Sequence, residues 1–344
     1  MLKIFGRARR DGSAKLVADV AAKFNVSQKF AEAYLDQQQV LPESRDSSYN
    51  AFWSNLTATQ QMYIGFALTT TRGNEVCAIV APRVAKRESR RHLDIGSGYG
   101  GFLRAFADAG FETVGVEILP SLAALSRANV ADLAGARVIE GDFLTMSAQA
   151  LGTFDCITCN DVIEHVRAPQ EAMRTIGSLL RPGGVLYMEI PNRDHIGFVA
   201  KDGHFSLFGI TTLPREAAAR YYDLTFRPST GIGYDDTMGD YLPLDAYQQT
   251  LRGAGIECML LDRHVSPATL PALLVELSSA YQSWVDDVKP KLPTDLARTV
   301  DACYARYASR LYADIAELPE SGPTDAFRTR YLRSFWSLIG TRVD

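Results

Sequence analysis

The stretch Leu93-Asp94-Ile95-Gly96-Ser97-Gly98-Tyr99-Gly100-Gly101 decides the fold, because it joins a short apolar run to a glycine-rich turn. Gly96, Gly98 and Gly101 fit the pattern G-x-G-x-x-G, in which glycine lets the backbone turn tightly and approach a ligand closely. An amphipathic run follows, so the stretch predicts a strand, a ligand-binding loop and a helix. The pattern alone also fits a nicotinamide or flavin site, or an ordinary strand-to-helix turn.

Asp94 separates these alternatives, because it lies two residues before the first glycine, at the end of the strand. Its carboxylate would repel a pyrophosphate and would attract the ammonium group of a methionine moiety. Glu117 ends the next apolar run, Val114-Gly115-Val116-Glu117, where a carboxylate can accept both hydroxyls of a ribose. Because both kinds of cofactor carry a ribose, Glu117 alone does not distinguish them.

Two further segments extend the pattern. Asp142 and Phe143 follow the run Val138-Ile139-Glu140-Gly141, and such a pair can bind an adenine amino group and stack on its ring. Leu180-Arg181-Pro182-Gly183-Gly184 predicts a helix stop and a tight turn into another strand.

From Arg91 onward, short apolar runs alternate with helical patterns, which is typical of a mostly parallel sheet with crossover helices. The predicted elements are His92–Ile95, Phe102–Ala109, Thr113–Ile118, Ser121–Ala131, Arg137–Glu140, Phe154–Asn160, Gln170–Leu180 and Val185–Ile190.

The regions outside this alternation also have recognisable patterns. Residues 14–38 and 48–86 predict N-terminal helices, in which Tyr63 and Arg72 are candidate cofactor contacts with surface or core roles as the alternative. Residues 192–242 break the rhythm, and a loop of that length is usually a lid or a binding segment. Residues 244–264 predict a helix and then a strand ending at Leu261, 268–316 a helical insertion, and 334–340 the last strand of the same sheet.

In their order and spacing, these motifs resemble the class I S-adenosylmethionine-dependent methyltransferase superfamily over residues 91 to about 192. The resemblance implies an α/β fold, a doubly wound and mostly parallel seven-stranded sheet of the Rossmann-like kind, with N-terminal helices and a C-terminal helical insertion. It divides the chain into a helical cap (1–86), a methyltransferase core (87–264 with 330–344, 192–242 being the lid) and a helical insertion (265–329). The implied cofactor, S-adenosylmethionine, would contact Asp94, Gly96, Ser97, Gly98, Glu117, Ile118, Asp142, Phe143 and Asn160.

The segment Asn160-Asp161-Val162-Ile163-Glu164-His165-Val166 follows the fourth strand, where the methyl group should point. If a helical turn begins at Asp161, then Glu164 and His165 share one face with it. The motif is similar to the Glu-x-x-Glu-His of ubiquinone-pathway O-methyltransferases and of small-RNA 2′-O-methyltransferases, in which it binds a metal. His204 could supply the further histidine of the RNA enzymes.

Three roles stay open for this motif. Asp161, Glu164, His165 and His204 could hold a divalent metal, although the aspartate shortens the reach of the first ligand. His165, with Asp161 and His204, could act as a metal-free base or orienting group. The alternative is a structural role, in which Glu164 forms a cap or a pair and His165 packs under the lid.

The acceptor is predicted to be an oxygen of a small molecule, because an aliphatic hydroxyl needs a base or a metal to lower its pKa. A sugar, glycan or natural-product hydroxyl, or a phenol, would suit the aromatic and acidic residues of 192–242. A small-molecule amine, RNA 2′-O-methylation and a non-catalytic cofactor-binding protein are the alternatives.

The composition of the chain bears on its partners and its location. The 344 residues are 47% hydrophobic and carry a formal net charge of −4 without a basic stripe, which disfavours a nucleic-acid partner. The five cysteines suggest reduced thiols and a cytoplasmic location, and Cys156 and Cys159 lie in an apolar run that predicts core packing. No run of about 18 apolar residues predicts a membrane span. A homo-oligomer is compatible with the sequence.

Overall fold

The computed structural model describes residues 13–41, 48–67, 70–226, 228 and 231–343. The chain forms two compact units, 1–158 with 179–185 and 159–178 with 186–344, and each is described by itself.

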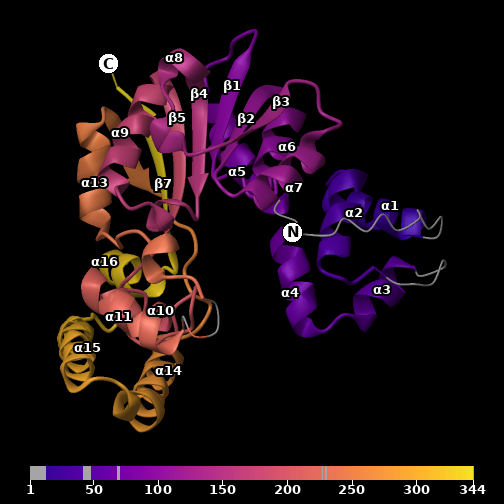
Figure 1. The fold of residues 1–344 in the computed structure, drawn as a ribbon. Helices are drawn as coiled ribbons and strands as arrows, with labels where there is room; N and C mark the ends of the chain where they lie inside the picture. The colour runs from indigo at the N-terminus through magenta and orange to yellow at the C-terminus, as the bar shows by residue number, and fades with distance from the viewer. Residues whose placement is uncertain (1–12, 42–47, 68–69, 227, 229–230, 344) are drawn as a thin grey trace. The chain divides into compact units, whose positions relative to one another are not determined.

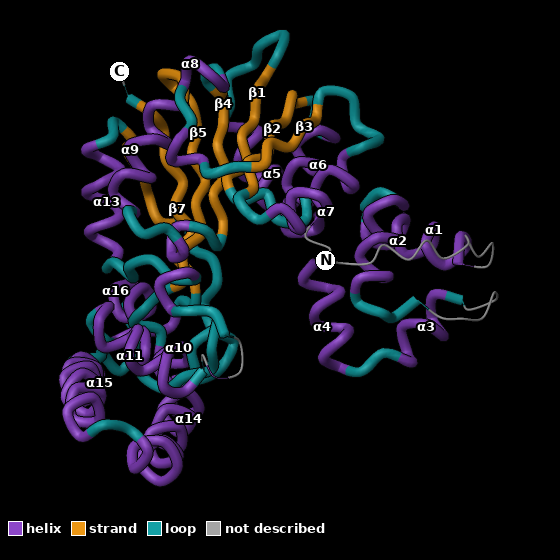
Figure 2. The backbone as a smooth tube through the Cα atoms, viewed as in Figure 1, coloured by secondary structure: helices purple, strands orange, loops and turns teal. Residues whose placement is uncertain are grey.

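The strands form a seven-stranded sheet in the order β3-β2-β1-β4-β5-β7-β6 (Figure 2). Strands β1, β2 and β3 pair in parallel, with Asp94 opposite Gly115 and Glu117 opposite Glu140, whereas β6 and β7 are antiparallel. The order confirms the predicted doubly wound, mostly parallel sheet. The strands are β1 (Arg90–Ile95), β2 (Phe111–Glu117), β3 (Ala136–Glu140), β4 (Phe154–Asn160), β5 (Leu180–Pro191), β6 (Ile256–Leu260) and β7 (Phe335–Arg342).

In the first unit, the predicted N-terminal helices are present and share a core with α7 (Figure 1). Ser27 caps α2 through the amide of Phe30 and also bonds to Ala128 and Asn129, which fixes the start of α2 on α7. The helices of this unit are α1 (Ser13–Phe24), α2 (Gln28–Gln37), α3 (Tyr49–Asn55), α4 (Ala58–Ala67), α5 (Thr70–Val80), α6 (Gly101–Asp108), α7 (Pro120–Val130) and α8 (Ala148–Leu151).

In the second unit, α10 packs against α14 and α11 packs against α15 (Figure 1). The helices are α9 (Pro169–Leu179, whose last residue belongs to the first unit), α10 (Ile196–Ala200), α11 (Arg215–Thr225), α13 (Leu244–Gly253), α14 (Leu270–Ser283), α15 (Thr294–Ala316) and α16 (Asp325–Phe327). The helices from α14 to α16 lie between β6 and β7 in the chain, which confirms that they are an insertion before the last strand.

The prediction of a long loop over 192–242 is wrong in part, because the segment contains α10 and α11. Its aromatic residues Phe208, Tyr221, Tyr222 and Tyr234 are buried in one core with residues of the insertion. The glycines and prolines that suggested a loop lie between the helices. Most of these aromatic side chains therefore stabilise the second unit by burying apolar surface.

The predicted turn over 180–184 is also corrected. Strand β5 begins at Leu180, directly after the end of α9, and Gly183 lies within it at a φ of 73°. Cys156 and Cys159 are fully buried on β4, as predicted, and none of the described cysteines forms a disulfide.

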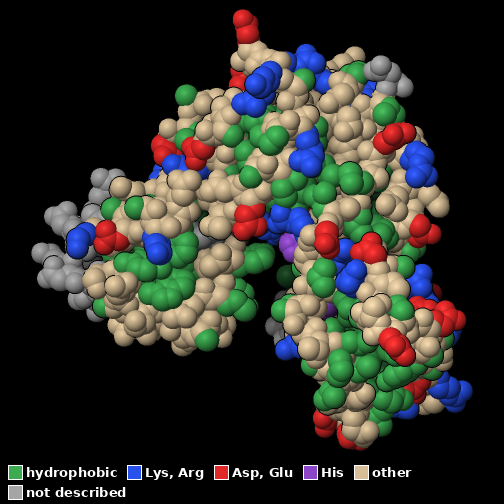
Figure 3. All heavy atoms as spheres, turned by 180° about the vertical axis from the view of Figure 1, so that it is seen from behind, with side chains coloured by type: hydrophobic (Ala, Val, Ile, Leu, Met, Phe, Trp, Pro, Cys, Tyr) green, Lys and Arg blue, Asp and Glu red, His purple; other side chains and the backbone are tan. Residues whose placement is uncertain are grey.

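Charge is distributed without a block of one sign on the face drawn in Figure 3, where basic and acidic side chains are interspersed. Among the described residues, no helix is both long enough and apolar enough to cross a membrane.

Candidate active site

The glycine loop after β1 has its amide groups turned toward protein acceptors. The amides of Gly96 and Ser97 donate to the carbonyl oxygen of Val116, at 2.8 and 3.1 Å, and the amide of Gly98 donates to Glu117 Oε2 at 2.8 Å. The amide of Gly100 donates to the carbonyl oxygen of Ser97. A pyrophosphate-binding loop needs such amides free for the ligand, so this loop suits a ligand that is not an anion.

Glycine is required where the loop approaches the sheet. Gly96, Gly98 and Gly100 have φ values of 69°, 50° and 78°, in the left-handed region that favours glycine. A Cβ at Gly115 of β2 would lie 2.8 Å from the Cβ of Ser97, closer than packed atoms allow. The loop is therefore held rigidly against β2.

Asp94 is buried and lies at the end of a hydrogen-bond chain. Thr158 Oγ1 donates to Asp94 Oδ1 at 2.6 Å, and His92 Nε2 lies 2.7 Å from the same hydroxyl. Burial raises the pKa of Asp94 to about 8, Glu117 adds to this increase, and the Thr158 hydrogen bond and Arg72 oppose it. A cationic ligand would stabilise the ionised carboxylate.

Glu117 is buried at the end of β2 and accepts hydrogen bonds from two loops, the one after β1 and the one after β2. Its Oε2 accepts from Gly98 and its Oε1 accepts from the amide of Leu119 at 3.0 Å. Each carboxylate oxygen has a second lone pair, so both oxygens can still accept a hydroxyl.

The other predicted cofactor residues of this unit lie after β2 and β3. Ile118 is exposed, and Phe143 is buried in a short 3₁₀ turn. Asp142 caps that turn through the amide of Leu144, at 2.9 Å from Oδ1. Arg72 on α5 faces the Phe102 ring and acts electrostatically on Asp94, whereas Tyr63 is exposed.

The segment after β4 differs from the predicted helical turn. Asp161 has a φ of 54°, and the turn that follows is a 3₁₀ turn over Ile163–His165. Because of this left-handed residue, the predicted common face of Asp161, Glu164 and His165 does not form. The side-chain amide atoms of Asn160 are buried and find no hydrogen-bond partner within the described part of the chain, which is the state expected of a ligand contact.

Glu164, His165 and His204 come together in the second unit. Each offers one ligand atom, and these atoms lie within 4.8 Å of one another. His165 Nε2 is 3.9 Å from Glu164 Oε1, and the two imidazole rings meet edge to face at 5.0 Å. Three of the four predicted metal ligands thus form one cluster of oxygen and nitrogen donors.

The segment 237–241 orients both histidines. The carbonyl oxygen of Thr237 lies 2.6 Å from His165 Nδ1, and Tyr241 Oη lies 3.0 Å from His204 Nδ1. Gly239 donates to the carbonyl oxygen of Glu164, and a Cβ there would collide with Val166. Because a carbonyl oxygen only accepts, Nδ1 of His165 donates to Thr237, and Nε2 is the ring nitrogen outside this hydrogen bond.

His204 is held neutral by its surroundings. Burial lowers its pKa to about 4, with a smaller contribution from His165. Asp202 accepts the amides of His204, Phe205 and Leu207, which fixes the loop that carries this histidine.

The remaining histidines lie in other surroundings. His195 caps α10 through the amide of Phe198, and burial lowers its pKa to about 4. His264 bonds to the buried Glu189 of β5 at 2.7 Å, a partner that the alternation of β5 could not reveal. His92 is buried on β1, within the predicted strand His92–Ile95, and the sequence gives no sign of its link to Asp94.

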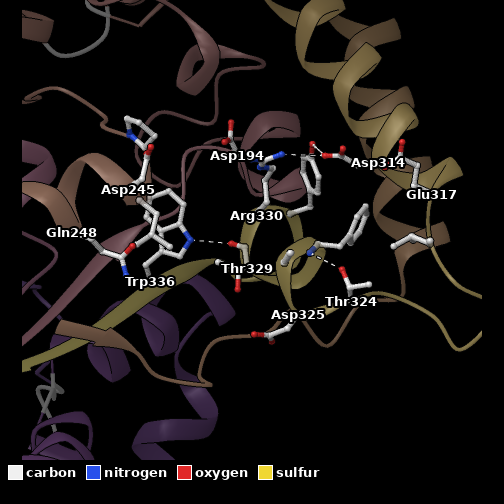
Figure 4. A pocket seen from close by; sticks show the side chains of 16 residues that line it. Asp194, Asp245, Gln248, Asp314, Glu317, Thr324, Asp325, Thr329, Arg330 and Trp336 are labelled. Atoms are coloured by element: carbon white, nitrogen blue, oxygen red, sulfur yellow. Dashed lines mark hydrogen bonds and ion pairs between the residues drawn. The ribbon is translucent and has the colours of Figure 1, made fainter.

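A cavity of about 790 Å³ in the second unit contains none of the predicted site residues (Figure 4). Asp194, Asp245, Asp314 and Asp325 lie around it, and Arg330 pairs with Asp314. Trp336 and Thr329 also line this cavity, and Trp336 donates its indole N–H to the carbonyl oxygen of Thr329 (Figure 4).

The sheet order, the acidic residue before the glycine loop and the acidic end of β2 together define a class I S-adenosylmethionine-dependent methyltransferase fold. A family model described as "Methyltransferase domain" matches residues 69–261, which is more than half of the chain. The chain belongs to this family of methyltransferases.

Curated relatives match a shorter part of the chain. A ubiquinone biosynthesis O-methyltransferase of Xanthomonas campestris is 32% identical over 124 residues, which cover 35% of this chain and 50% of the relative. The enzyme of the same name from Xanthomonas axonopodis is 31% identical over 137 residues, which cover 38% of this chain and 54% of the relative. The chain therefore spans about half the length of the curated relatives it matches.

Solved structures resemble the chain at low identity. The match to the YcgJ protein of Bacillus subtilis covers 80% of this chain and 99% of the YcgJ chain, with 11% identity and a TM-score of 0.42. The match to a putative sarcosine dimethylglycine methyltransferase of Galdieria sulphuraria covers 80% of this chain and 85% of that protein's chain, with 15% identity and a TM-score of 0.42.

Proposed function

We propose that this protein transfers the methyl group of S-adenosylmethionine to an oxygen atom of a small molecule. The observation that carries the oxygen acceptor is the orientation of His165, whose Nδ1 donates to the carbonyl oxygen of Thr237 at 2.6 Å, so that Nε2 is the ring nitrogen left to take a proton from a hydroxyl. A neutral amine acceptor needs no such base. The matched ubiquinone biosynthesis O-methyltransferases also act on oxygen by name.

The carboxyl ends of β1, β2, β3 and β4, with the loops that follow them, are proposed to hold the cofactor. Asp94 would bind its ammonium group, Gly96, Ser97 and Gly98 its methionine end, and Glu117 the two ribose hydroxyls. Ile118, Asp142 and Phe143 would line the adenine, and Asn160 would contribute its unpartnered amide. When bound, the cofactor supplies a methyl group that its sulfonium has already activated.

The second unit is proposed to handle the acceptor's proton. His165 Nε2 would take the hydroxyl proton as the oxygen is methylated, and Glu164, 3.9 Å away, would stabilise the imidazolium that results. His204 would orient the acceptor as a neutral imidazole, and Asp161 would contribute from the carboxyl end of β4. The acceptor class includes sugar, glycan, natural-product and phenolic hydroxyls.

A transfer assay with labelled S-adenosylmethionine tests the proposal against sugar, phenol, amine and RNA acceptors. His165→Asn is the sharpest variant, because its amide can still donate to Thr237 while the proton acceptor is lost. We expect turnover to fall about 100-fold or more, with binding of S-adenosylhomocysteine unchanged. Methylation confined to amines, or full turnover by His165→Asn, would overturn the oxygen assignment.

A metal-assisted reaction is the second candidate, supported by the cluster of Glu164, His165 and His204. Imidazole and carboxylate donors suit Zn²⁺ or Mn²⁺, and such an ion would lower the pKa of an acceptor hydroxyl. Zinc and manganese titrations followed by calorimetry, on the wild type and on His204→Ala, distinguish the metal-assisted reaction from the reaction with His165 as a metal-free base. Stoichiometric binding that the variant abolishes, together with activity lost on chelation, would replace the base with a metal.

A further inference from the structure

The chain His92–Thr158–Asp94 has a defined direction. Asp94 is a hydrogen-bond acceptor when ionised, so the Thr158 hydroxyl donates its proton to it. The Thr158 oxygen must then accept from His92, which places the imidazole proton on Nε2. The opposite nitrogen, His92 Nδ1, is buried and has no hydrogen-bond partner among the described residues.

All three side chains are held in place by burial and packing. His92 and Thr158 are fully buried and Asp94 is 3% exposed. The His92 ring stacks on Phe106 at a centroid distance of 3.8 Å, and burial lowers its pKa to about 3. His92 is therefore neutral, and it polarises the Thr158 hydroxyl without adding a charge.

We propose that Thr158 and His92 are positioning residues that orient Asp94 and favour its ionised form for the ammonium group of the cofactor. This inference rests on the proposed function, because it assigns that group to Asp94. Neither side chain is proposed to touch the cofactor. They act by aiming one polarised donor at the carboxylate from the protein side.

Other groups also act on Asp94. Glu117 on β2 disfavours the ionised carboxylate, and Arg72 on α5 favours it. Since these two charges oppose each other, the Thr158 hydrogen bond is the specific contact through which Asp94 can be tuned. Its loss would favour the protonated, neutral acid, which cannot pair with an ammonium ion.

The test is calorimetric binding of two ligands between pH 6 and pH 9.5. S-adenosylhomocysteine carries the ammonium group, whereas 5′-methylthioadenosine has the same nucleoside without it. Because the Asp94 pKa is about 8, wild-type affinity for S-adenosylhomocysteine should rise about tenfold per pH unit below pH 8. Affinity for 5′-methylthioadenosine should stay nearly constant.

Thr158→Val removes the hydroxyl at nearly constant volume, and Thr158→Ser restores it. We expect the pH midpoint for S-adenosylhomocysteine to move upward in Thr158→Val, with affinity at pH 7 about tenfold weaker, and to stay at the wild-type value in Thr158→Ser. His92→Phe keeps the stacking on Phe106 and should move the midpoint in the same direction by less. In all three variants, binding of 5′-methylthioadenosine reports an intact pocket.

The outcomes separate the inference from the proposed function. If the wild type binds neither ligand, the proposed function fails. If it binds both and the Thr158→Val midpoint stays where it is, the positioning role is wrong. Equal weakening of both ligands by Thr158→Val would assign Thr158 a structural role and would also overturn the inference.

Discussion

Replacing Asp94 with asparagine should stabilise the protein in the absence of cofactor while it weakens cofactor binding. Asparagine keeps an oxygen that can accept from Thr158 and has nearly the same volume, so the packing is preserved. What changes is the charge, because asparagine has no carboxylate to ionise in a buried place.

The sign and the size of the expected difference in unfolding free energy follow from the pKa of Asp94. In the folded protein the Asp94 pKa is raised from 3.8 to about 8, so the folded state holds the proton over a range in which the unfolded chain has released it. The contribution of this group to stability is therefore complete below about pH 4 and is lost as pH rises toward 8. Between pH 5 and pH 8 the wild type should lose roughly 4 kcal/mol relative to Asp94→Asn, at about 1.4 kcal/mol per pH unit.

Urea unfolding of both proteins at pH 5, 6, 7 and 8, without cofactor, measures this difference. Most other titrating groups are common to both proteins and cancel in the comparison. S-adenosylhomocysteine should then reverse the order at pH 8, because it stabilises the wild type more than the variant. Parallel stability curves with no pH-dependent gap would refute the buried-acid reasoning.

Three further substitutions should have distinct effects. Glu117→Gln should weaken S-adenosylhomocysteine and 5′-methylthioadenosine alike, by about tenfold in calorimetry, because the ribose is common to both ligands and one charged acceptor is lost; a loss confined to S-adenosylhomocysteine would contradict the ribose assignment. Gly239→Ala should lower turnover at least tenfold with cofactor affinity unchanged, since its Cβ would push the segment 237–241 away from Val166; wild-type kinetics would show that this segment does not orient His165. Asp155→Ala should cost about 3 kcal/mol of unfolding free energy in urea titrations, because buried Asp155 accepts two hydrogen bonds from Arg181; a change within 0.5 kcal/mol would show that Arg181 is satisfied without it.

The parts of the fold that could be predicted are those written in short periodic segments. The glycine loop follows from the left-handed φ values that Gly96, Gly98 and Gly100 adopt. The strand β7 could be placed in the sheet despite the long insertion before it, because residues 334–340 form an apolar run that predicts a strand. These features depend on local chemistry, which a sequence carries directly.

The site could be predicted only where neighbours in sequence are neighbours in space. The prediction of a helical turn from Asp161 is wrong, because the sequence carries no signal for the left-handed backbone conformation that Asp161 adopts. A 3₁₀ turn over Ile163–His165 forms after it instead. The pairing of His92 with Thr158 joins residues 66 positions apart, and the pairing of His165 with Thr237 joins residues 72 apart. Such contacts depend on strand order and loop packing, which periodicity does not encode.

The assignment of Asp94 to the ammonium group has a consequence for selectivity. S-adenosylmethionine and S-adenosylhomocysteine both carry that group, so the ionisation of Asp94 should raise the affinities for substrate and product alike. Because S-adenosylmethionine also carries a positive sulfonium, the ionised carboxylate attracts it through a second charge, and its affinity should rise by the larger factor. Preference must arise where the two molecules differ, at the sulfur and its methyl group, and no residue of the His92–Thr158–Asp94 chain is proposed to reach that atom.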